Sequence, residues 1–204
     1  MSTSSLIRLG GLAAVVGGVL LFIADLIDFF AFDPEENLSE VVTAASYAFI
    51  QVLNMLGIVL VLCGLVGLYA RQSEAAGVLG LVGFVVALAG TVLDSGLLWT
   101  SLFAAPSAAI AAPGFVDAEF TGSLALGLPL TFITFGLGWL LFGVASLRAG
   151  VYPRIPAIVL IIGAVLTSFP LPLVGLVIDV AVAWLGFSLL TGRDASAGQP
   201  AGAR

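Results

Sequence analysis

The sequence predicts an all-α membrane protein, a polytopic bundle of six transmembrane helices with both termini in the cytoplasm. Hydrophobic residues make up 61% of the 204 residues and charged residues only 9%, and the mean hydropathy is +1.23. A soluble domain cannot bury so large an apolar share. Apolar runs of roughly 20 residues, long enough to cross a bilayer as helices, recur along the chain. The predicted spans cover residues 8–32, 42–70, 76–102, 123–147, 155–170 and 173–191.

The first apolar run follows Arg8 and continues to Phe32. A cleaved signal peptide is the alternative, but the run exceeds a typical signal-peptide core and no small-residue cleavage site follows it directly. We therefore expect it to stay as the first span. An acidic loop follows at residues 33–40, in which Asn37 or Ser39 could cap the second span.

The remaining boundaries depend on turn signals. Arg71 and Glu74 predict a short turn into the third span. Residues 104–122 are rich in alanine and proline, and their pattern fits either a loop or a short interfacial helix. Two prolines delay the fifth span, a proline-bounded hairpin at residues 169–172 ends it, and residues 193–204 have the composition of a disordered cytoplasmic tail.

The arginines predict the orientation of the helices. All six basic residues of the chain are arginines, and with six spans they all fall on one side of the membrane. The acidic loop at residues 33–40 and the acids Asp117 and Glu119 fall on the other side. Basic loops stay in the cytoplasm, so both termini are predicted to be cytoplasmic.

Small residues share helical faces with intramembrane acids. In the third span Gly83, Ala87, Gly90 and Asp94 recur at helical spacing. Small side chains let a neighbouring helix approach closely. Asp94 therefore points into the bundle, because an ionised carboxylate is costly in lipid.

The predicted topology puts several polar side chains in the outer half of the bilayer, where no arginine can pair with them. These predicted binding residues are Asp25, Asp28, Asp94, Asp179, Gln51, Asn54 and Thr134. Carboxylates without a counter-charge must take up a proton, bind a cation or contact water. The sequence thus predicts an outward-facing acidic pocket for protons, cations or a small cationic molecule, as in a small transporter, channel or binding protein.

A structural interpretation remains open beside this one. Asp25 and Asp28 could be hydrated at the end of a helix, and a protonated Asp179 could bond Asn54 or Thr134 across helices. The protein would then be a non-catalytic membrane scaffold or partner subunit, packing through its small-residue faces against itself or another protein.

Composition excludes several chemistries. The chain has no lysine and no histidine, so Schiff-base chemistry, imidazole metal sites and serine–histidine pairs are impossible. One cysteine, Cys63, permits no intrachain disulfide or cysteine zinc site. The net charge of −6 does not suit nucleic acid. We therefore predict no enzyme activity, no catalytic residue, no metal site and no cofactor.

Three stretches, GLVGLYARQSEAAGVLGLVGF, GLGWLLFGVASLRAG and PLPLVGLVIDVAVAWLGFSLL, have a glycine- and leucine-rich texture. In this the sequence resembles uncharacterised six-span integral membrane proteins of high-GC bacteria, catalogued as domains of unknown function. The resemblance implies a multi-pass protein of a bacterial plasma membrane and gives no residue a role. The expected partners are the lipid bilayer, a cation or small molecule, and a second copy of the chain.

Overall fold

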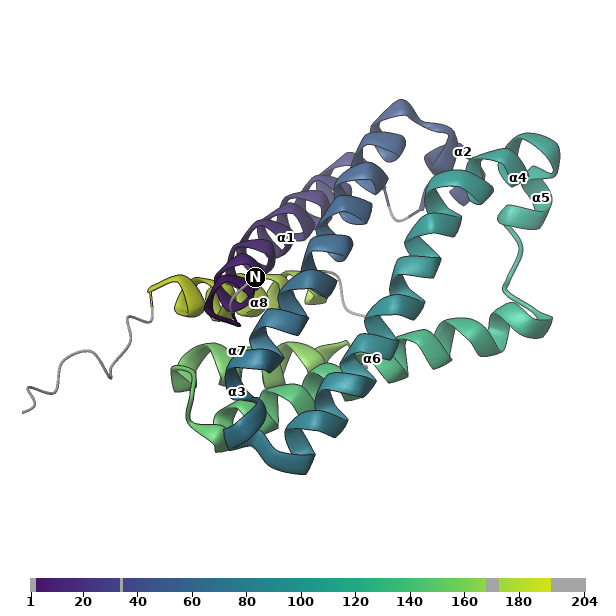
Figure 1. Ribbon diagram of the computed structural model, residues 1–204. Helices are drawn as coiled ribbons and strands as arrows, with labels where there is room; N and C mark the ends of the chain where they lie inside the picture. The colour runs from purple at the N-terminus through teal and green to yellow at the C-terminus, as the bar shows by residue number, and fades with distance from the viewer. Residues whose placement is uncertain (1–2, 34, 168–172, 192–204) are drawn as a thin grey trace, which may run out of the picture.

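The computed structural model describes residues 3–33, 35–167 and 173–191, and within these ranges all regular structure is helical (Figure 1). The main helices are α1 (Thr3–Ala31), α3 (Ala45–Trp99), α6 (Gly122–Ala149), α7 (Arg154–Leu166) and α8 (Val174–Thr191). Three short helices, α2 (Leu38–Thr43), α4 (Ala105–Ala111) and α5 (Pro113–Val116), and a π-helical turn (Thr100–Ala104) complete the described elements. The predicted all-α class is confirmed.

In the described part of the chain, four helices are long and apolar enough to cross a membrane. They are α1, α3 with its continuation into α4, α6 and α8. The fifth main helix, α7, is apolar but shorter. These helices indicate a membrane protein, as the composition predicted.

Helix α3 turns back on itself at Gly77, whose backbone is not helical (φ 56°, ψ −149°). Figure 1 shows its two segments, residues 45–76 and 78–99, running in opposite directions. The rings of Tyr69 and Phe84, one from each segment, stack with centroids 4.3 Å apart. The predicted turn at Arg71 and Glu74 is wrong by several residues. The side chains there are good helix formers, whereas glycine adopts a positive φ at little cost.

Other boundaries also differ from the prediction. The second predicted span begins at Ala45 because Ala44 has an extended backbone, which separates it from α2. Asn37 precedes α2 without a side-chain cap. The ambiguous residues 104–122 contain helices α4 and α5. Helix α7 ends at Leu166, and the predicted hairpin at residues 169–172 and the tail at 193–204 lie outside the described residues.

Glycines hold the helices together in a ring. Gly67 of α3 lies against Gly10 of α1, and Gly186 of α8 lies against Ala14 of α1. Gly163 of α7 contacts Ile178 of α8, Gly143 of α6 contacts α7, and Gly83 of α3 contacts α6. The order around the ring is therefore the first segment of α3, α1, α8, α7, α6 and the second segment of α3, which the Tyr69–Phe84 stack joins to the first.

The small-residue face predicted for the third span packs closely against another helix, as expected. A Cβ atom added at Gly83 would lie 2.8 Å from the backbone nitrogen of Phe142, and one added at Gly90 would collide with Phe135. Ala87 is fully buried against Gly138. The small residues thus let α3 and α6 approach closely.

The arginine end is the name we give to the end of the ring at Arg8, Arg71, Arg148 and Arg154. The contact of Gly10 with Gly67 brings the first two together. The hydroxyl of Tyr152, in the turn between α6 and α7, donates a hydrogen bond of 2.7 Å to the carbonyl oxygen of Leu68. This bond brings the turn that Arg148 and Arg154 flank alongside α3.

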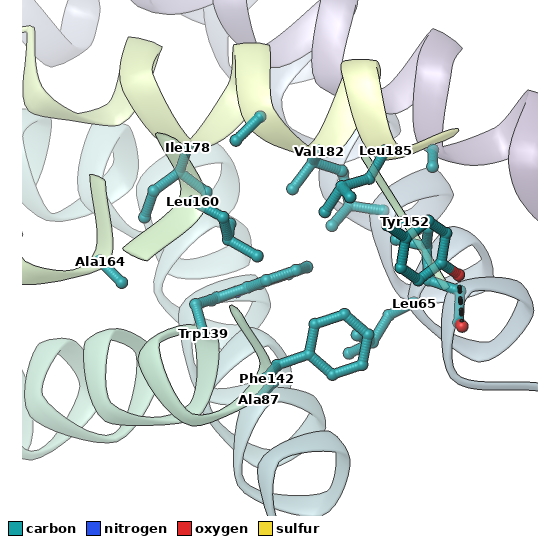
Figure 2. Packing of buried hydrophobic residues seen from close by; sticks show 14 of the residues in the cluster. Leu65, Ala87, Trp139, Phe142, Tyr152, Leu160, Ala164, Ile178, Val182 and Leu185 are labelled. Carbon is teal, nitrogen blue, oxygen red and sulfur yellow. Dashed lines mark hydrogen bonds between the residues drawn. The ribbon is translucent and has the colours of Figure 1, made fainter. Parts of the chain in front are cut away.

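The buried hydrophobic core fills the interior of the ring in the half next to the arginine end (Figure 2). Trp139 and Phe142 of α6 are fully buried among Leu65, Leu160 and Leu185 from three other helices. Figure 2 shows the tryptophan ring pointing into the cluster between Leu160 and Phe142, and the hydrogen bond of Tyr152 at the edge of the cluster. The interior is therefore dense in this half.

Candidate functional site

A cavity of about 710 Å³ lies toward the opposite end of the ring, which we call the acidic end. Four of the five main helices line it, with Asp25 of α1, Asn54 and Asp94 of α3, Phe132 of α6 and Asp179 of α8 in the wall. Thr167, directly after the end of α7, also lies in the wall. Ile178 belongs both to the cavity wall and to the buried core. The cavity therefore begins where the dense packing stops.

Asp179 is the most enclosed acid of the cavity. Its side chain is 6% exposed, and its Oδ2 atom has no hydrogen-bond partner among the described residues. The backbone of Asp179 packs against Gly18 of α1, where a Cβ would lie 2.6 Å from the Asp179 carbonyl oxygen. This close contact fixes the position of the helical turn that carries the carboxylate. The cavity thus contains a firmly held polar group with an unused acceptor.

Asp25 reaches the cavity from α1 over the first turn of α8. A Cβ atom added at Gly175 would collide with the Oδ2 atom of Asp25, so the missing side chain makes room for the carboxylate. Gly175 lies one helical turn before Asp179 on the same face of α8. The carboxylates of Asp25 and Asp179 are therefore neighbours, and their charges interact.

Asp94 and Asn54 complete the polar part of the wall from the two segments of α3. The charge of Asp94 interacts with those of Asp25 and Asp179. Asn54 is 8% exposed and offers both a donor and an acceptor. Four of the seven predicted binding residues thus come together around one cavity.

The other three predicted residues do not line the cavity. Asp28 is exposed one turn beyond Asp25. Gln51 is buried without a hydrogen-bond partner for its Oε1 atom, one turn before Asn54 on α3. The hydroxyl of Thr134 donates to the carbonyl oxygen of Leu130 in its own helix. The sequence placed these three residues at the same membrane depth as the cavity. Asp28 and Gln51 lie one helical turn away from cavity residues, and the hydroxyl of Thr134 bonds within its own helix.

The sequence did not predict the apolar part of the wall. Phe132, Ile133 and Phe135 of α6 line the cavity together with Leu98 of α3. A phenylalanine in an apolar span carries no signal that separates lining from packing. Pro129, noted in the sequence as a proline in the early turns of the fourth span, also lies in the wall.

The charge of the cavity is unbalanced. None of the described residues that line it is basic. In the described ranges, no group of three or more acidic or cysteine side chains is arranged to hold a metal ion. The three carboxylates thus do not converge on one point, although Asp25 and Asp179 are neighbours. The arrangement can hold a positively charged guest or a proton, in surroundings that are mostly apolar.

Comparison with known proteins adds no relative, since no protein-family model, curated protein or solved structure matches the chain.

Proposed function

We propose that this protein is a six-span protein of a bacterial plasma membrane whose acidic cavity binds a proton, a cation or a small cationic molecule. It would act as a small transporter, channel or binding protein, without a catalytic step. The two parts of the proposal, the topology and the ligand, have separate support.

The length and bend of α3 support six spans. A straight helix of its 55 residues would be about 80 Å long, far more than the roughly 30 Å of a hydrocarbon core. Its two segments run in opposite directions from Gly77, so each would cross the membrane once. Together with α1, α6, α7 and α8 they make six.

The arginines support cytoplasmic termini. Arg8, Arg71, Arg148 and Arg154 lie at one end of the ring. Arg8 is near the start of α1, Arg71 is near the end of the first segment of α3, and Arg148 and Arg154 are at the end of α6 and the start of α7. The opposite end has the exposed acids of residues 33–40 and Asp117. An arginine-rich end faces the cytoplasm, and the cavity then opens toward the outer half of the bilayer.

The surroundings of Asp179 are the single observation that supports a bound ligand. A carboxylate in apolar surroundings is costly unless a proton or a positive charge accompanies it. Its Oδ2 atom has no partner among the described residues, and the cavity beside it has room for a guest. A structural role would use both oxygen atoms in hydrogen bonds between helices.

The scaffold alternative depends on small-residue faces that remain free for a partner. Gly83 and Gly90 of those faces contact α6, and Gly186 contacts α1, within the same chain. Gly175 faces the carboxylate of Asp25. This use of the small residues favours the cavity proposal.

The thermal stability of the detergent-purified protein tests the proposal across pH and a panel of cations. A ligand that binds only the folded state stabilises it by about 2.7 kcal/mol at a concentration of 100 times Kd. We expect at least one condition to raise the Tm of the unmodified protein but not of Asp179→Asn. Glu119→Gln is the matched control, because it removes the same charge at an exposed position outside the cavity.

Superimposable curves for the unmodified protein and Asp179→Asn under every condition would contradict the proposal. A ligand-free Asp179→Asn protein should fold, and its Tm should equal or exceed that of the unmodified protein. The substitution removes a buried charge without breaking any hydrogen bond to Oδ2.

A further inference from the structure

The helices around the cavity differ in the chemistry that they contribute. The second segment of α3 supplies one carboxylate, that of Asp94. Asp25 and Asp179 lie on the neighbouring helices α1 and α8. On the far side of the ring, α6 contributes only apolar residues to the wall, namely Pro129, Phe132, Ile133 and Phe135. A guest that uses both sides needs a positive group and an apolar body.

An inorganic cation would use only a small part of this site. Such ions are held by several oxygen ligands around one point, and no such group of acids occurs in the described ranges. A volume of about 710 Å³ lies within the range of small-molecule sites, which are mostly apolar with a few polar groups.

The apolar side is open to the outside of the ring. Ile133 and Phe132 line the cavity and are nevertheless 65% and 47% exposed. They belong to α6, one of the helices that can span a membrane. Figure 1 shows the first turns of α6 extending away from the other helices, and Leu126 and Leu130 on these turns are exposed as well. In a bilayer this exposed apolar side meets lipid chains.

We propose that the ligand is an amphiphilic organic cation that enters from the bilayer past the exposed side of α6 and pairs its positive group with Asp179. This inference rests on the proposed function and narrows its ligand class. The apolar body of the ligand lies against Phe132 and Phe135, and the charge lies between α1 and α8.

Three probes separate charge from apolar body. Tetraphenylphosphonium has both, tetramethylammonium has the charge with little apolar surface, and triphenylphosphine oxide has the apolar body without the charge. Apparent Kd values come from Tm as a function of probe concentration, for the unmodified protein, Asp179→Asn and Glu119→Gln. We expect tetraphenylphosphonium to bind at least tenfold more tightly than either other probe. Asp179→Asn should weaken it at least tenfold, while Glu119→Gln should leave it unchanged.

Two outcomes overturn the inference in different ways. Binding of tetramethylammonium or sodium that matches tetraphenylphosphonium and depends on Asp179 would overturn the amphiphile while the proposed cation site stands. If no cation or pH gives a shift that depends on Asp179, the proposed function fails as well.

The route is tested separately by a fluorophore at position 133. The single native cysteine is removed by Cys63→Ala, and Ile133→Cys is labelled in protein reconstituted into phospholipid vesicles. We expect quenching by lipids with a nitroxide on the acyl chain and little quenching by iodide. Strong quenching by iodide with none by the lipids would place position 133 in water and overturn entry from the bilayer.

Discussion

The two ends of the helix ring use the same helices and differ in how closely those helices pack. At the arginine end Trp139 and Phe142 of α6 are fully buried, and Tyr152 ties the α6–α7 turn to α3. At the acidic end Phe132, ten residues earlier on α6, is 47% exposed beside a cavity of about 710 Å³. Glycines lie against the backbone of neighbouring helices at both ends, as Gly138 does at Ala87 and Gly18 does at Asp179, but large side chains fill the interior of the ring only toward the arginine end. The dense core and the cavity thus occupy different halves of the same ring.

The largest effect is expected where glycine meets backbone. In Gly138→Leu the new side chain would collide with the backbone of Ala87, which cannot move aside as a flexible side chain could. Overpacking costs about 1–3 kcal/mol when side chains can adjust, so we expect at least the upper value and a Tm lower by roughly 6–12 °C. Thermal unfolding in detergent measures this change in Tm.

Gly96→Ala is the control for that substitution. A Cβ atom there has nothing within 4 Å, and alanine favours a helix over glycine by about 1 kcal/mol. We expect an unchanged or higher Tm. Equal losses in both variants would show that close packing of α3 on α6 does not stabilise the protein.

A pair of phenylalanines on α6 compares the two ends directly. Phe142→Ala leaves a void in the core, whereas Phe132→Ala widens a space that is already open. Lipid is as apolar as the protein core, so moving the phenylalanine ring out of the core costs little and the empty void dominates the loss of stability. We expect the free energy of unfolding to fall by on the order of 2 kcal/mol for Phe142→Ala and by near zero for Phe132→Ala. Unfolding by denaturing detergent distinguishes them, and the opposite order would contradict the proposed difference between the ends.

The turn at Tyr152 should have a smaller effect that depends on pH. Burial raises the pKa of its hydroxyl, although Arg71 opposes the shift. The unfolded chain loses the Tyr152 proton near pH 10, whereas the folded protein keeps it to a higher pH. The contribution of Tyr152 to the stability of the fold is therefore complete below pH 10 and falls as the pH rises further.

Tyr152→Phe tests this contribution. Loss of the bond to the Leu68 carbonyl oxygen should cost about 1 kcal/mol below pH 10. The Tm of the unmodified protein should approach that of the variant between pH 10 and 11. Parallel Tm curves over that range would exclude titration of Tyr152 as a source of instability.

The smallest effect is expected outside the ring, where α2 meets the chain after α5. The backbone nitrogen and the hydroxyl of Ser39 each donate a 2.8 Å hydrogen bond to the Asp117 carboxylate in an exposed position. Ser39→Ala keeps the backbone bond, so we expect a loss of about 0.5 kcal/mol or less. A double-mutant cycle with Asp117→Asn measures the coupling, and a coupling above about 2 kcal/mol would show that this contact holds the acidic end together.

The sequence predicted the features that depend on composition and helical spacing. Hydropathy alone indicated the membrane class and the all-α fold. The spacing of Gly83, Ala87 and Gly90 predicted a close helix contact, which the structure confirms against α6. These features follow from the chain itself, because an apolar helix must satisfy its own backbone and small residues set how closely another helix can approach.

The tertiary structure determined which acids line the same cavity and which residues face them. Asp25 and Asp28 look alike in the sequence, yet only Asp25 lies over Gly175 in the cavity. Gln51 and Asn54 share a polar face, and only Asn54 lines the cavity wall. One helical turn moves a side chain by about 5.4 Å, so register between helices from distant parts of the chain determines the site. That register depends on contacts between helices, such as Gly18 with Asp179 and Gly90 with Phe135, which no single helix encodes.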